Sequence, residues 1–166
     1  MFELRPISQD SLAGALAKAE RYRLLNEPGE AESICRDILK IEPGNQQALI
    51  SLILALTDQI PDDAHAFTNA VSTVGRLQTR YDQAYYEGIA WERRAKARHH
   101  ARGQGAHRYV YEWIVEALRL FDEAASLRAP GNDDAVLRWN ACVRFLHRHK
   151  ELGPTPEDVS EPVVSE

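Results

Sequence analysis

Apolar residues recur along this chain at intervals of three and four, and the strict apolar–polar alternation of a half-buried strand does not appear. Between residues 30 and 41, for example, Ala31, Ile34, Cys35 and Ile38 fall on one face of a helix. Turn signals such as Pro28-Gly29 separate these stretches. The pattern predicts an all-α protein with helices over about residues 10–25, 30–41, 46–57, 63–78, 81–101, 106–127 and 133–149.

A second regularity links the helices in pairs. The first pair, residues 12–45, has small residues where two helices would touch, larger apolar residues beside them and a proline near its end: Ala19, Tyr22, Ala31, Cys35, Ile38 and Pro43. This spacing resembles the tetratricopeptide repeat, a helix–turn–helix unit of about 34 residues. The same frame continues through residues 46–80 and 81–131, with an insertion in the third unit. Its matching positions are Ile53, Leu56, Ala66, Ala70 and Thr73 in the second unit and Gly88, Trp91, Ala117, Phe121 and Ala124 in the third.

The resemblance implies a right-handed solenoid of helical hairpins, formed by residues 1–150 and closed by a capping helix at 133–149. An unrelated helical bundle is the alternative, because small residues are common wherever helices touch.

The resemblance also implies that the first helix of each unit lines a concave groove. It assigns the following residues to the groove: Leu16, Glu20, Gln47, Ile50, Leu54, Asp82, Tyr85 and Ile89. The apolar members would form a continuous strip, and exposed strips of this kind usually mark a contact surface. We therefore expect a protein–protein interaction scaffold that binds a partner helix or peptide there. Alternatively, the N-terminal segment with Phe2 and Leu4, or a second copy of the chain, covers the strip.

Charge is distributed unevenly along the chain. The formal net charge is −5, yet residues 93–108 carry six cations and no acid: Arg93, Arg94, Lys96, Arg98, Arg102 and Arg108. Because this run coincides with the insertion, we expect a long hairpin with a basic tip. Binding of nucleic acid or another polyanion is the alternative function, although the acidic overall balance disfavours it. The acidic, proline-containing tail at 151–166 should be extended and could fold back on the basic surface.

The titratable residues show no pattern typical of an active site. His99 and His100 are adjacent, and His147 and His149 are two residues apart, whereas metal-binding pairs on one helix prefer spacings of three or four. The acidic pairs Asp62-Asp63 and Asp133-Asp134 stand at predicted helix starts, where carboxylates accept hydrogen bonds from unpaired backbone N–H groups. We therefore expect no enzyme, no metal and no cofactor. A ligand-sensing or enzymatic helical domain remains a third hypothesis.

Two further observations concern location. Cys35 and Cys142 fall on apolar helix faces, which predicts reduced core residues in a cytoplasmic protein. The longest apolar run, 48–56, is too short to span a bilayer, and the N-terminus lacks the pattern of a secretory signal. We expect no membrane partner.

Overall fold

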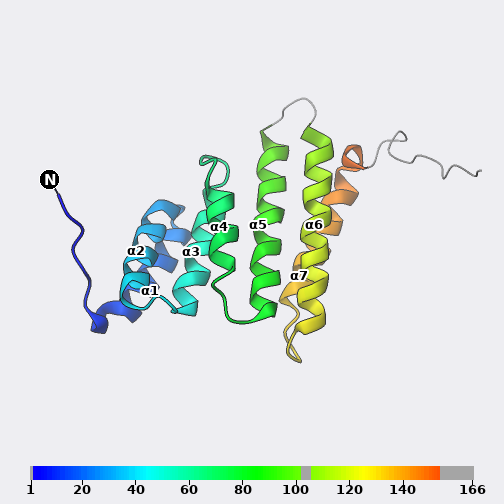
Figure 1. Cartoon of the computed structure of the whole chain (residues 1–166). Helices are drawn as coiled ribbons and strands as arrows, with labels where there is room; N and C mark the ends of the chain where they lie inside the picture. The colour runs from blue at the N-terminus through cyan, green and yellow to red at the C-terminus, as the bar shows by residue number, and fades with distance from the viewer. Residues whose placement is uncertain (1, 102–105, 154–166) are drawn as a thin grey trace, which may run out of the picture.

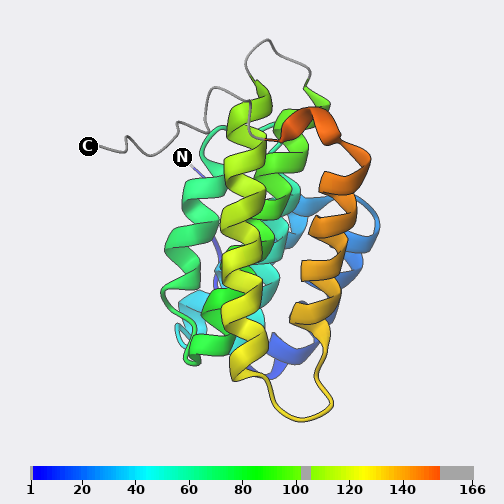
Figure 2. The ribbon, with the colours of Figure 1, turned by 90° about the vertical axis from the view of Figure 1, so that its right-hand side faces the viewer.

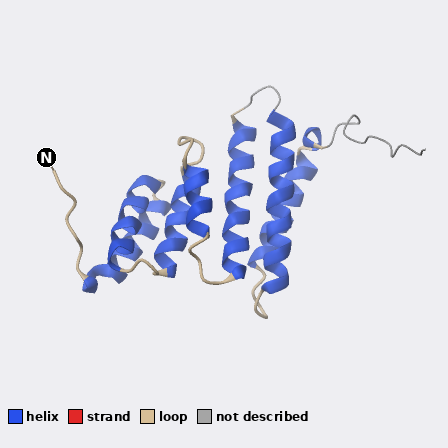
Figure 3. Ribbon diagram, in the orientation of Figure 1, coloured by secondary structure: helices blue, strands red, loops and turns tan. Residues whose placement is uncertain are grey.

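The computed structural model describes residues 2–101 and 106–153, which fold into seven α-helices without any strand (Figures 1 and 3). The helices are α1 (Leu12–Leu24), α2 (Pro28–Ile41), α3 (Gln46–Asp58), α4 (Ala66–Val74), α5 (Arg80–His100), α6 (Ala106–Leu127) and α7 (Asp134–Arg148). Short 3₁₀ helices, η1 (Gln9–Ser11) and η2 (Lys150–Leu152), precede α1 and follow α7. The prediction of an all-α protein is confirmed.

Local chemistry explains where the helices begin and end. The Asn45 side chain accepts a hydrogen bond from the Ala48 N–H at 2.9 Å, and the Thr79 hydroxyl accepts one from the Asp82 N–H at 3.0 Å. Each caps the first turn of its helix, α3 or α5. After α1, Asn26 adopts a φ of 60°, in the left-handed region that stops a helix.

Helix α4 is shorter than the predicted span of 63–78. At its C-terminal end, Arg76 N–H donates to the Thr73 carbonyl and Leu77 N–H to the Val74 carbonyl, both at 3.0 Å. These bonds link residues three apart, so the chain tightens into turns after Gly75 and does not continue as an α-helix.

Helices that follow one another in the chain pack against one another, from α1 on α2 to α6 on α7. The odd-numbered helices also touch in order, α1 with α3, α3 with α5, and α5 with α7. We call the surface along which these four meet the odd-helix face. Figure 1 shows the helices side by side in chain order, with α5 and α6 much longer than α3 and α4, and Figure 2 shows α7 and α4 on opposite sides of α5 and α6. This arrangement is consistent with stacked helical hairpins.

Most positions of the repeat frame lie in the interior. Eleven of them are at most 1% exposed: Ala19, Ala31, Cys35, Ile38, Ile53, Leu56, Ala66, Ala70, Ala117, Phe121 and Ala124.

Burial raises the pKa of the Cys35 thiol to about 11 and that of the Cys142 thiol to about 12, and both cysteines are free. In the described residues, no helix has the length and apolar character that a bilayer crossing requires.

Two helices approach each other closely at Gly88, in the long hairpin of α5 and α6. A Cβ atom added at Gly88 would lie 2.7 Å from a carbon of the Phe121 ring. Any side chain at this position would therefore force the Phe121 ring or one of the two helices to shift. Glycine is the residue that lets α5 lie directly on the ring.

Candidate functional site

The apolar residues assigned to the groove do not form an open strip. Ile89 is 1% exposed, so the expectation that it lines a groove is wrong. The other four are half-buried: Leu16 and Ile50 pack on the core of α1–α4, and Leu54 and Tyr85 on the core of α5–α7. Packing between neighbouring helices already covers most of this surface.

The polar residues assigned to the groove have varied surroundings. Glu20 and Gln47 are exposed to solvent. Asp82 instead accepts a hydrogen bond from the Thr79 hydroxyl at 2.6 Å, at the start of α5. Asp82 therefore contributes to the cap of its own helix.

One turn further along the same helices, an ion-pair network joins α1, α3 and α5. Arg23 Nε donates to Asp58 at 2.8 Å, and Arg93 donates to the same carboxylate from the other side. Arg93 also donates to the Thr57 hydroxyl at 2.6 Å and to the Leu54 carbonyl at 3.1 Å. Burial lowers the pKa of Arg93 and the Asp58 charge opposes that change.

A second network joins α5 to α7. The Glu92 side chain, 2% exposed, forms ion pairs with Lys96 and, at 3.4 Å, with Arg138. The two networks together contain four cations and two carboxylates, an excess of two positive charges within the networks. Such an excess attracts anionic groups.

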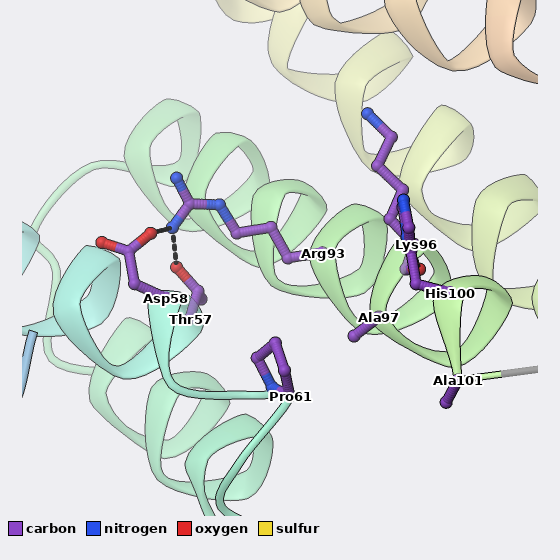
Figure 4. A pocket seen from close by; sticks show the side chains of 8 residues that line it. All are labelled: Thr57, Asp58, Pro61, Arg93, Lys96, Ala97, His100 and Ala101. Carbon is purple, nitrogen blue, oxygen red and sulfur yellow. Dashed lines mark hydrogen bonds and ion pairs between the residues drawn. The ribbon is translucent and has the colours of Figure 1, made fainter. Parts of the chain in front are cut away.

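A cavity of about 610 Å³ lies between the C-terminal end of α3 and the last turns of α5 (Figure 4). It is lined by Thr57, Asp58, Pro61, Arg93, Lys96, Ala97, His100 and Ala101. Figure 4 shows Arg93 reaching across to Thr57 and Asp58, while Lys96 and His100 project together from α5. The His100 Nδ1 lies 2.6 Å from the Lys96 carbonyl oxygen, which can only accept, so this nitrogen carries a proton.

A second hollow, of about 450 Å³, lies on the other side of Pro61 and Ala97. Its wall includes Arg94, whose guanidinium lies 4.1 Å from the ring centroids of both Phe67 and Trp113. Arg94 therefore joins α4, α5 and α6 through cation–π contacts.

The five described cations of the predicted basic tip do not form one surface. The prediction is wrong for Arg93, Arg94 and Lys96, whose charges are engaged by Asp58, by aromatic rings and by Glu92. Arg98 is exposed, and Arg108 pairs with Glu112 at 2.9 Å. Arg102 and residues 154–166 of the acidic tail lie outside the described residues, whereas Glu151 and Leu152, at the start of the tail, belong to η2.

The sequence contains a signal for this site beyond the positions assigned to the groove. Arg23, Asp58 and Arg93 are separated by 35 residues each, close to the repeat length. If the repeat frame is extended by one helical turn beyond the groove positions, these three residues fall at the same position of successive units. Comparison of the chain with protein-family models, curated proteins and solved structures finds no match, so the function is inferred from the site alone.

Proposed function

We propose that this protein is a non-enzymatic interaction scaffold, a solenoid similar to tetratricopeptide repeats, that binds an acidic segment of a partner protein. The segment would occupy the cavity between α3 and α5 on the odd-helix face. Support for the repeat architecture comes from the buried small residues and from the contacts between successive odd-numbered helices.

The observation that carries the proposal is the charge of the cavity wall. Its carboxylate, Asp58, is already paired with Arg23 and Arg93, so Lys96 adds a cation that no acid of the wall compensates. Glu92 also forms an ion pair with Lys96, but the charge of Glu92 is divided between Lys96 and Arg138. An Asp or Glu side chain would find charge-assisted hydrogen-bond donors there.

The shape of the cavity suits a short peptide segment. Its volume of about 610 Å³ is that of a pocket for a few side chains. Pro61, Ala97 and Ala101 supply small apolar contacts between the charged groups. The ionisable groups of the wall are bound to fixed neighbours, which suits holding a charged ligand better than exchanging protons with one.

A peptide-display selection on the purified chain would test this proposal. We expect the selected sequences to be enriched in Asp and Glu, and we expect their synthetic peptides to bind with micromolar affinity in fluorescence anisotropy. Ala97→Trp fills the cavity and should weaken binding at least about tenfold, which is about 1.4 kcal/mol. Ser33→Trp, at an exposed position of α2, is the matched control and should bind as the wild type does.

Failure to enrich acidic sequences, or equal binding by Ala97→Trp and the wild type, would contradict the proposal. The alternative function, polyanion binding through the basic segment, predicts a different result. An oligonucleotide would then bind with steep salt dependence and lose affinity in Arg98→Ala, whose side chain lies outside the cavity. Tighter peptide binding after removal of residues 154–166 would indicate that the acidic tail competes for the same site.

A further inference from the structure

Three metal-ligating side chains that are distant in the sequence meet where α5 and α7 end. His99 lies in the last turn of α5, His149 follows α7, and Glu151 lies in η2. One ligand atom from each can be chosen so that all lie within 4.8 Å of one another. We propose that His99, His149 and Glu151 bind a divalent transition-metal ion of the zinc type.

Two imidazoles and a carboxylate match the ligand preferences of Zn²⁺, Co²⁺ and Ni²⁺. Bonds of about 2.1 Å in a tetrahedral site place ligand atoms about 3.4 Å apart, so the most distant pair must approach by up to about 1.4 Å. His149 and Glu151 have side chains 31% and 50% exposed, which leaves them free to rotate. Water would complete the coordination and leave one exchangeable position.

The surrounding packing holds these side chains together. Leu152 is 1% exposed and packs into the core of α5–α7, which fixes η2 against the helices and keeps Glu151 beside His149. The His149 Nδ1 lies 3.1 Å from the Glu151 carboxylate. The His99 ring lies edge-on to both Phe145 and His149, with centroids 5.4 and 4.3 Å apart. Figure 2 shows η2 turning from the end of α7 toward the ends of α5 and α6.

A hollow of about 590 Å³ beside these rings offers room for an ion and its water. Burial, and then the neighbouring His149 and His100, lower the pKa of His99, which favours the neutral imidazole that a metal requires. Lys96 and Arg148 also line the hollow and repel a cation, although Glu92 pairs with Lys96. We therefore expect micromolar affinity, weaker than that of a closed structural zinc site.

The sequence predicted no metal because the spacings of the histidines within one helix are unsuitable. The structure assembles the ligands from three elements instead. This site does not depend on the proposed function, because its ligands lie outside the cavity between α3 and α5.

The test uses the full chain without an affinity tag, after treatment with a chelator. Titration with Co²⁺ should produce the visible absorption of a four-coordinate ion at one equivalent, and calorimetry with Zn²⁺ should give the same stoichiometry. His99→Ala and His149→Ala should each weaken Zn²⁺ binding at least about tenfold, and Glu151→Gln should weaken it as well. Zn²⁺ should also raise the melting temperature of the wild type more than that of these three variants.

His65→Ala and His147→Ala remove exposed histidines outside the cluster and are the matched controls. Both should bind Zn²⁺ as the wild type does. The proposal is overturned if Zn²⁺ does not bind at micromolar concentrations, or if His149→Ala binds it unchanged. Circular dichroism of each variant shows whether a loss of binding reflects the missing ligand or a loss of fold.

Discussion

The helices α1–α4 and the helices α5–α7 bury their contacts with different kinds of side chain. The core of α1–α4 consists of alanine, leucine, isoleucine and valine, with Cys35 among them. The core of α5–α7 contains Phe121 and Phe145 and is flanked by Trp91 and Trp113. Its interior also holds the carboxylate of Glu92, whereas the buried polar groups of α3 and α4 are hydroxyls.

This difference indicates where the functional chemistry is located. The buried core of α1–α4 is mainly aliphatic, and burial of such side chains stabilises a fold directly, whereas buried charges add little net stability because desolvation offsets their attraction. Charges held inside a protein are often there for recognition or specificity. Helix α5 contributes to both ion-pair networks, to the cavity and to the histidine cluster. We infer that α1–α4 serve mainly as a support and that α5 carries the binding groups.

The largest expected effect is on the reactivity of the two cysteine thiols. One of them lies in each core, so their labelling rates compare the two regions. With pKa values of about 11 and about 12, against 9.0 for an ordinary thiol, the thiolate fractions of Cys35 and Cys142 at pH 8 should be about 100-fold and about 1,000-fold lower. Labelling with a thiol reagent, followed by peptide mass spectrometry, measures both rates. We expect both sites to react only as the chain unfolds in urea.

The order in which the sites become reactive sharpens the comparison. Simultaneous labelling would show that both cores unfold as one unit, and earlier labelling of Cys35 would show that α1–α4 open separately. Both thiols keep their proton in the folded chain and lose it above pH 9 once unfolded. Stability should therefore fall as the pH rises from about 9 towards 11, the folded value for Cys35. Rapid labelling of folded Cys142 would contradict its place in the core.

The next largest effect concerns the buried carboxylate of Glu92 and the free energy of unfolding. Glu92→Gln removes the charge shared by Lys96 and Arg138 and should lower the free energy of unfolding by about 1.5–3 kcal/mol. Glu123→Gln is the matched control, because Glu123 pairs with Arg80 and Arg119 at the surface and its loss should cost less than about 1 kcal/mol. Urea unfolding measures both. Equal effects would mean that the interior of α5–α7 does not depend on the buried charge.

Replacing a glycine by alanine should change the free energy of unfolding in opposite directions in the two regions. Gly88→Ala places a Cβ against the Phe121 ring and should destabilise the protein by about 1–3 kcal/mol. Gly14→Ala in α1 meets no atom within 4 Å and should stabilise the protein by up to about 1 kcal/mol, because alanine favours the helix. Thermal unfolding measures both changes. Addition of Phe121→Leu to Gly88→Ala should recover part of the loss, and no recovery would place the strain elsewhere.

The helices and the interior of α1–α4 could be predicted from the sequence with good accuracy. Periodicity, the Asn45 cap and the small residues of the repeat frame act locally, so they are visible in the order of residues. The prediction failed at Ile89 and at Arg93 for one shared reason. Exposure depends on how closely α3, α5 and α7 approach one another, and a pattern along one helix contains no information on that distance.

The sequence by itself determined that this chain is helical, where most helices begin and end, and which small residues face another helix. These properties follow from interactions within a few residues. The tertiary structure decided which charges meet: Asp58 between Arg23 and Arg93, Glu92 beside Arg138, and His99 beside His149. Each of these groups joins different helices, and their distances depend on helix lengths and packing angles that only the folded chain sets.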